Sequence, residues 1–317
     1  MNKLDKVHER VIKIRQKCPS RMSRYGIFPS KGGDGGDDCL WLGLLSSAGF
    51  VIATNGLANC QALHGEKYPG MFYRNPVRRE THNSGYSHFF SRDMAMGVLC
   101  AYAAHKQRFD SSQLMWLNHI NAIRACAVKK PKWMGGGCLI RSPMYRYAKD
   151  DRSDITPAMW ALMGRVWEHN GWPKHKCMDT YKYADGDISK ESAKIVPIGY
   201  QLHLLAVGAY LKWMLKQSRA IRQEVSSTCY IRQPDNLFYK IVAQEKVIDS
   251  DMETFLERCP NPDTFVPRDY WLWEKDDQDP YYSCGWDWVF LGYLIIRIKT
   301  GTFGLPPSLT TGEYDFF

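Results

Sequence analysis

The sequence predicts an all-α protein in which helical hairpins pack side by side around a ring. Apolar residues recur at spacings of three and four along most of the chain, with little strict alternation. Polar loops stand before the most apolar segments, as in "GGDGGDDCLWLGL" at 32–44. Units made of a loop and two helices bury their common faces by stacking, and about six such hairpins would close a ring. We therefore expect one helical domain over residues 1–317, with long polar loops on one rim.

Start signals and apolar spacing define the expected helices. Asp37 or Asp38 stands before "CLWLGLL", Ser91 stands before "RDMAMGVLC", and Thr156 precedes Pro157, which suits the first helical position. The segments "CLWLGLLSSAG", "MAMGVLCAYAA" and "WVFLGYLII" are apolar on every side, which predicts inner helices. Strands, if present, are expected to be short and to lie in the loops. The expected helices span 3–17, 37–49, 56–65, 91–106, 111–129, 156–170, 196–217, 219–228, 236–246, 250–258 and 284–300.

Small residues and a repeated pattern support this arrangement. Gly43, Gly97, Gly164 and Gly292 lie within expected inner helices, where they would allow neighbouring helices to approach closely. Two loop-to-helix junctions also match in one gapless register, which suggests an internal repeat or a chance match favoured by composition. The matched pairs are Gly70 with Gly137, Arg74 with Arg141, Pro76 with Pro143, Arg79 with Arg146, Met96 with Met163, and Gly97 with Gly164.

Charge and composition narrow the classes of partner. The formal net charge of +9 favours anionic partners, such as an acidic polysaccharide, nucleic acid or a membrane surface. The basic residues form only short clusters, so nucleic-acid binding rests on charge alone and ranks last. The 11 tryptophans and 18 tyrosines suit a large core or a surface on which sugars or bases stack, and the core explanation accounts for most of them.

Location and cofactors are inferred from what the sequence lacks. The N-terminus is charged throughout and has no apolar signal-peptide core. No stretch reaches the roughly 18 apolar residues that span a bilayer, so no membrane insertion is expected. The ten cysteines contain no CxxC pair, which indicates buried free thiols in a reducing compartment. Neither a cofactor nor a metal site is expected, because zinc and calcium spacings are missing.

The junctions before the inner helices carry the candidate site. If the inner helices run parallel, their N-termini open on one rim and the loops before them line one funnel. Helix dipoles there favour carboxylates and lower their pKa, while crowding by like charges raises the pKa of a carboxylate, so that one rim can hold both an acid and a base. The residues that would gather there are Asp34, Asp37, Asp38, His88, Arg92, Asp93, Asp150, Asp151, Asp154, Asp276, Asp277, Trp286 and Asp287.

A purely structural role competes for each of these residues. Aspartate at a helix start is most often an N-cap, and a single loop histidine such as His88 usually forms local hydrogen bonds. What favours a site is that "GGDGGDD" supplies more acids than one cap requires. The pairs Arg74/Arg79 and Arg141/Arg146 could clamp anionic groups of a substrate or could bind the acidic loops of a neighbouring junction.

The succession of "GGDGGDDCLW", "FFSRDMAMG" and "CGWDWVFLG" resembles the six-hairpin (α/α)6 toroid of several glycosidase and polysaccharide-lyase families. "SRDMAMGVL" also resembles uncharacterised proteins of tailed bacteriophages. The first resemblance implies two rim carboxylates acting as acid and base, from Asp37 or Asp38 with Asp93, then Asp287. It further implies sugar stacking on Tyr282, Trp286 and Trp288. In toroid lyases a Tyr, His and Arg set abstracts the proton, and Tyr86, His88 and Arg92 could supply that set.

Three functions therefore remain open. The first is a hydrolase of a surface or anionic polysaccharide, whose carbohydrate contacts would include Arg74, Arg79, Arg141, Arg146 and Asp154. The second is a non-catalytic protein that keeps the toroid for host recognition or virion structure, with virion proteins as partners. The third is a polysaccharide lyase. A cytoplasmic or virion location agrees with each of them.

Overall fold

The structure is a computed structural model that describes residues 1–32, 37–66, 69–81, 92–105, 109, 157–174, 176–180, 186–217, 219–272 and 282–304. The described part is mostly helical, as expected, and its one sheet is the antiparallel hairpin of β1 (Ser20–Ser23) and β2 (Gly26–Pro29). The N-terminal helices are α1 (Lys3–Arg15), α2 (Asp38–Ser47), α3 (Val51–Ala58), α4 (Pro76–Glu80) and α5 (Arg92–Ala104).

The remaining helices continue the same pattern of apolar and amphipathic segments. The expected start at Pro157 is confirmed, and two helices that the sequence analysis did not identify, α9 and α10, follow that helix. The bounds are α8 (Pro157–Asn170), α9 (Lys176–Thr180), α10 (Gly186–Ile195), α11 (Tyr200–Met214), α12 (Arg219–Arg232), α13 (Leu237–Gln244), α14 (Asp249–Arg258) and α15 (Trp286–Lys299).

The expected helix over 56–65 is wrong. The helix there is α3, which begins at Val51 and ends at Ala58. Gly56, the first residue of the expected helix, lies inside α3 and packs closely on another element. A Cβ at Gly56 would stand 3.0 Å from the Cβ of Phe28 in β2. The glycine therefore permits a helix-to-hairpin contact and does not end the helix. The expected helix over 111–129 lies outside the described residues.

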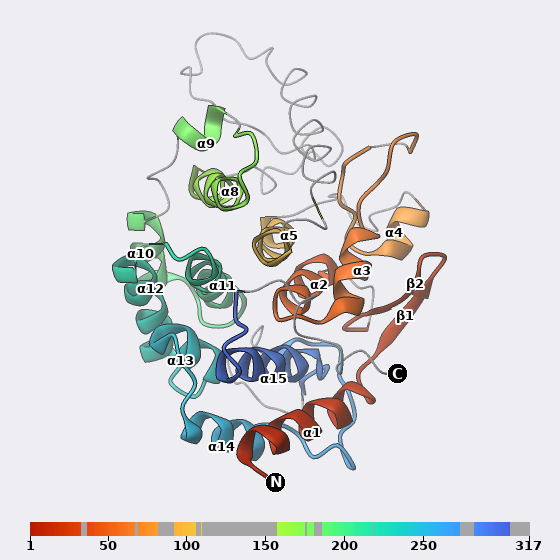
Figure 1. The fold of residues 1–317 in the computed structure, drawn as a ribbon, viewed down its shortest axis with the longest axis vertical. Helices are drawn as coiled ribbons and strands as arrows, with labels where there is room; N and C mark the ends of the chain where they lie inside the picture. Colours follow the sequence, from red (N-terminus) through yellow and green to blue (C-terminus); the bar gives the residue numbers. More distant parts are fainter. Residues whose placement is uncertain are drawn as a thin grey trace.

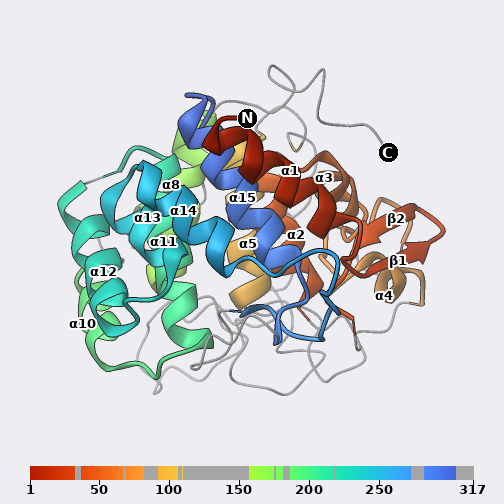
Figure 2. The same ribbon diagram turned by 90° about the horizontal axis from the view of Figure 1, so that it is seen from below.

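Apolar helices lie inside and amphipathic helices outside (Figure 1). Every residue of α2 is buried, and α15 is buried from Trp286 to Arg297. In Figure 1, α2, α5, α8 and α11 are seen nearly end-on toward the middle of the molecule, and α15 is seen more from the side, below α2 and α11. Helices α1, α10, α12 and α14 lie toward the outer edge. Figure 2 shows α1 lying along α15, so the first and last helices pack side by side.

Helices α2 and α5 run parallel and in close contact. Gly97, near the start of α5, lies against the start of α2: a Cβ at Gly97 would come 2.6 Å from the Cα of Leu40. A Cβ at Gly43 would come 2.1 Å from the carbonyl oxygen of Gly97. At the other end of the two helices, Nε2 of His105 lies 2.7 Å from the carbonyl oxygen of Ser46. The expected close approach at these two glycines is thus confirmed, and both helices start at the same end.

Helices α11 and α15 have the same sense as α2. His203, at the start of α11, packs its ring against Trp41 at 5.8 Å between centroids. Tyr210, near the end of α11, forms a 3.1 Å hydrogen bond with the hydroxyl of Ser47 at the end of α2. Arg297, near the end of α15, donates to the carbonyl oxygen of Ser47 at 3.4 Å. The C-terminal ends of α2, α11 and α15 therefore meet.

Helix α8 joins this group through α5. The side-chain amide of Asn170, the last residue of α8, donates to the carbonyl oxygen of Tyr102 at 3.0 Å, near the end of α5. Trp167 packs edge-on against the ring of Tyr102 at 5.8 Å. The inner helices that the structure describes on both sides of α5 consequently open their N-termini at one end of the molecule.

Candidate functional site: the rim at the start of α2

A buried carboxyl group lies at the start of α2. Asp38 is 1% exposed and is surrounded by three donors. The hydroxyl of Ser30 donates to Oδ2 at 3.0 Å, the backbone N–H of Lys31 donates to Oδ1 at 3.3 Å, and the amide of Asn75 donates to Oδ2 at 3.4 Å. Segments on both sides of α2 in the sequence therefore converge on this carboxyl group.

Burial raises the pKa of Asp38 to about 6, because the ionised form loses its hydration. The hydrogen bonds from Ser30 and Lys31 act in the opposite direction and favour the ionised form. A carboxyl group with such a pKa exchanges its proton near neutral pH. This is the property that general acid catalysis demands of a carboxylic acid.

Asp37 is the more accessible of the two neighbouring acids, with a side chain 28% exposed. Its carboxylate pairs with the Lys31 ammonium at 3.8 Å and with Arg74 Nη1 at 3.6 Å. Asp37 occupies the N-cap position, but its side chain makes no cap hydrogen bond. The backbone N–H of Cys39 instead donates to the carbonyl oxygen of Arg74 at 2.8 Å. Capping, the simplest explanation for an aspartate here, therefore does not account for the Asp37 side chain.

A stack of two tryptophans connects this junction with the segment before α15. The rings of Trp41 and Trp271 are stacked at 4.3 Å between centroids and 9° between planes. The ammonium of Lys31 lies 5.7 Å from the centroid of the Trp41 ring, a cation–π distance. Gly32, at φ +90°, lies so close to Asp269 that a Cβ there would come 2.4 Å from its carboxylate. The loops before α2 and α15 thus lie side by side.

Asp287 lies at the start of α15 and is fully occupied by structural hydrogen bonds. It is 0% exposed. Its carboxylate accepts the backbone N–H of Leu272, the hydroxyl of Ser283 and the backbone N–H of Trp288. These bonds fix the segment that carries Trp271 onto the start of α15. The structure therefore gives this acid a positioning role at the rim.

Of the three aromatic residues expected to stack on sugars, two lie in the core. Trp286 is 6% exposed and donates from Nε1 to the carbonyl oxygen of Pro19 at 2.6 Å. Trp288 is 3% exposed and packs against Phe255. Tyr282 is 47% exposed and follows the undescribed segment 273–281. Only Tyr282 of this set therefore offers its ring to solvent.

Asp93 lies in the first turn of α5 and is partly exposed. Because α5 starts beside α2, Asp93 shares the end of the molecule that carries Asp37 and Asp38. Arg92 begins the same helix, but its side chain lies outside the described part. Asp34, Tyr86, His88, Arg141, Arg146, Asp150, Asp151, Asp154, Asp276 and Asp277 also lie outside the described residues.

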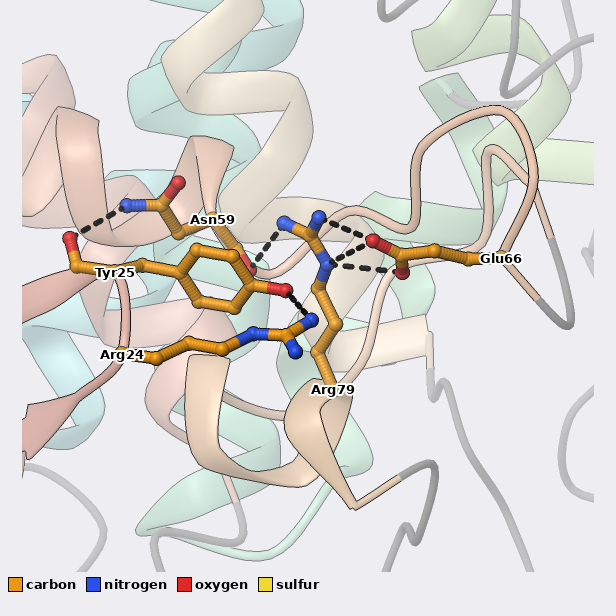
Figure 3. Close-up of polar contacts among 5 residues, drawn as sticks. All are labelled: Arg24, Tyr25, Asn59, Glu66 and Arg79. Carbon is orange, nitrogen blue, oxygen red and sulfur yellow. Dashed lines mark hydrogen bonds and ion pairs between the residues drawn. The ribbon is translucent and has the colours of Figure 1, made fainter.

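Arg79 serves a structural cluster and not the Asp38 junction (Figure 3). It is 2% exposed, and its guanidinium donates to Glu66 through Nε at 3.0 and 3.2 Å and through Nη2 at 2.5 Å. Nη1 donates to the carbonyl oxygen of Asn59 at 3.1 Å. The ring of Tyr25 lies between two guanidinium groups, with Cζ of Arg79 at 4.2 Å and Cζ of Arg24 at 4.7 Å from its centroid. The tip of the β1–β2 hairpin is thereby attached to α4.

Several residues of the junction were not identified from the sequence. Ser30, Asn75 and Trp271 contact or position the acids, yet each is a common residue type in a loop. The one available signal was Asn75 before Pro76, a helix-start pattern that the structure confirms: Asn75 caps α4 through its Oδ1 while its amide donates to Asp38. Trp41 was recognised only as part of an inner helix.

The described residues contain neither a cluster of metal ligands nor a membrane-spanning helix. Within them, no three His, Cys, Asp or Glu side chains come together as they would around a metal ion. In the same part of the chain, every helix is too short or too polar to cross a membrane. The seven cysteines whose side chains the structure describes carry free thiols, and all except Cys18 are buried.

Comparisons with protein-family models, with curated proteins and with solved structures found no match for this chain.

Proposed function

We propose that the chain is a glycan-active protein that hydrolyses a surface or anionic polysaccharide at the rim formed by the starts of α2 and α5. One observation carries the proposal: Asp38, whose pKa burial raises to about 6, lies at the start of α2 beside the start of α5, which carries the partly exposed carboxylate of Asp93. Glycoside hydrolysis needs one carboxyl group that is protonated near neutral pH and a second that is ionised. This rim offers both kinds of group.

The roles follow from burial and charge. Asp38, held by Ser30, Lys31 and Asn75, is the proposed acid that protonates the leaving oxygen. Asp93, in the first turn of the neighbouring helix, is the proposed base or nucleophile, and its carboxyl group should lie roughly 5–9.5 Å from that of the acid. Lys31 and Arg74 give this rim positive charge beside Asp37, which suits an anionic sugar.

A second candidate is a non-catalytic glycan-binding or virion scaffold on the same helical framework. It is favoured by the number of structural partners that the acids have: three donors on Asp38, three on Asp287, and two cations beside Asp37. Groups held in this way stabilise a fold without any chemistry. The lyase hypothesis depends on Tyr86, His88 and the Arg92 side chain, which lie outside the described part.

The test is a panel of acidic and neutral polysaccharides incubated with wild type, Asp38→Asn and Asp93→Asn, with new reducing ends as the readout. Asp235→Asn, at an exposed carboxylate between α12 and α13, is the matched control. We expect cleavage of an acidic substrate to fall at least about 100-fold in the two rim variants and to stay unchanged in the control. A wild-type protein that binds glycan without cleaving any would support the scaffold instead. Unsaturated products that absorb in the ultraviolet would indicate a lyase.

A further inference from the structure

A pocket lies at the end of the inner helices opposite the rim. Helix α11 starts beside Trp41 at the rim, and the pocket opens where this helix ends, against the turn that follows α15. Its volume is about 190 Å³. The lining residues are Trp213, Met214, Lys216, Arg222, Phe303 and Gly304. The pocket is therefore separate from the acids of the proposed glycan site.

One wall of the pocket is aromatic. The rings of Trp213 and Phe303 lie 4.3 Å apart between centroids, tilted by 38°, and both side chains are partly exposed. The ring of Phe303 is also 6.1 Å from that of Tyr210. Met214 adds a buried thioether that adapts to the shape of an apolar guest. A flat apolar group would find contacts on these side chains.

The backbone at this pocket uses charged residues where glycine is the usual choice. Lys216 and Glu245 are the non-glycine residues with positive φ in the described part, at 53° and 54°. Glu245 follows directly on the end of α13, and Lys216 follows the C-cap residue of α11, Leu215; a left-handed residue at such a position closes the last turn. A side chain in this conformation is less stable than glycine, so an observed exception points to a role for the side chain.

The role of Glu245 is visible. Its carboxylate holds the guanidinium of Arg222 through Nε and, at 2.9 Å, through Nη2. Arg219 lies 3.7 Å from the same carboxylate. The guanidinium of Arg222 is therefore fixed in one orientation, and its charge is balanced by Glu245. It shapes the pocket without adding net charge to it.

Lys216 has no corresponding partner. Its side chain is exposed, and within the described part no carboxylate forms an ion pair with its ammonium group. An unbalanced positive charge thus stands at the mouth of an aromatic pocket. This combination fits a guest that has a flat apolar body and one negative charge.

We propose that this pocket binds a small aromatic monoanion, with the ring against Trp213 and Phe303 and the anionic group on Lys216. Size supports a single ring, because a cavity of about 150 Å³ holds benzene and drug-sized ligands need roughly 300 Å³ or more. The chemical class of the proposed ligand is therefore a single aromatic ring that carries one carboxylate group. The pocket shares no residue with the rim, so ligand binding here is independent of the proposed glycan activity.

The test uses 4-fluorophenylacetate, observed by fluorine NMR, against its uncharged match 4-fluorophenylacetamide. We expect the acid to bind the wild-type chain at least about 10-fold more tightly than the amide. Lys216→Gln should abolish this preference. Lys246→Gln removes one exposed positive charge next to Glu245 but outside the pocket lining, and it should leave the preference intact.

Two further variants separate binding from folding. Lys216→Gly should lose the acid preference while raising Tm by about 2 °C, because glycine tolerates the left-handed backbone. Phe303→Ala should weaken acid and amide equally. The proposal is overturned if the wild type binds neither ligand at millimolar concentration, if acid and amide bind alike, or if Lys246→Gln acts as strongly as Lys216→Gln.

Discussion

Gly43 and Gly97 form a backbone-to-backbone contact between two inner helices: the Cβ that Gly43 lacks would stand 2.1 Å from the carbonyl oxygen of Gly97. Backbone lies against backbone here, so no side chain can rotate away to make room. The junctions that start α2 and α5 are held together by this contact.

Gly43→Ala and Gly97→Ala should each destabilise the fold. Overpacking costs about 1–3 kcal/mol, and against backbone we expect the upper part of that range, reduced by less than about 1 kcal/mol of gained helix propensity. Urea unfolding measures the effect. Gly208→Ala in α11 is the control, because its new Cβ would meet only the end of Met96 at 3.7 Å. This variant should be neutral or slightly more stable. Equal effects at all three positions would contradict the close approach.

The raised pKa of Asp38 predicts a pH dependence of stability. The carboxyl group ionises near pH 6 when folded and near pH 4 in the unfolded chain. Between these values the folded state binds more protons, so its stability falls as pH rises, by up to about 1.4 kcal/mol per pH unit. Asp38→Asn removes this slope. Urea unfolding of the wild type and of Asp38→Asn between pH 4 and pH 7 measures this slope. If the free energies of unfolding of the two proteins change in parallel with pH, Asp38 is ionised throughout.

Arg79→Ala should destabilise the fold and leave any glycan affinity of the remaining folded protein unchanged. The substitution leaves Glu66 without its bidentate partner in a largely buried place, at a cost of about 3 kcal/mol. Arg78→Ala, one position earlier in α4, is the control and should change stability by less than about 0.5 kcal/mol. Thermal unfolding and a binding assay on each variant provide the measurement. A normal Tm with lost glycan binding would instead make Arg79 a substrate clamp.

Asp287→Ala should lower the free energy of unfolding by about 3 kcal/mol or more, since it leaves three buried donors without their acceptor. Asp249→Ala is the matched control, because Asp249 also lies in the first turn of a helix but has a side chain 66% exposed. That variant should lose less than about 1 kcal/mol. A stable Asp287→Ala protein would show that the loop before α15 is held by other contacts.

The inner helices could be predicted because burial on every side leaves a plain signal. Charged residues occur only near the ends of α2 and α15, and the structure buries α2 throughout and α15 from Trp286 to Arg297. α3 could not be placed, because Asn55 and Gly56 resemble a turn in sequence, whereas the contact of Gly56 with Phe28 exists only in three dimensions. The short, polar α9 and α10 give a weaker periodic signal.

The sequence could predict that the loops before the inner helices lie at one rim, but it could not predict which side chains the rim residues contact. Asp37 and Asp38 were recognised from the surplus of acids before α2. That Asp38 is the buried acid and Asp37 the paired one depends on Ser30, Arg74 and Asn75, which arrive from other loops. Similarly, the resemblance to toroid glycosidases implied that Trp286 and Trp288 stack on sugars, whereas the structure packs both rings into the core.

The packing of α1 on α15 has a consequence for biosynthesis. Arg15 and Tyr293 donate and accept across this contact although 278 positions separate them in the chain. Arg10 likewise reaches the carbonyl oxygen of Cys259 at 2.9 Å. The apolar face of α1 is consequently covered only after α15, which lies far later in the chain, has been synthesised. Such non-local closure slows folding and exposes nascent chains to aggregation, so we expect production of this protein to depend on chaperones.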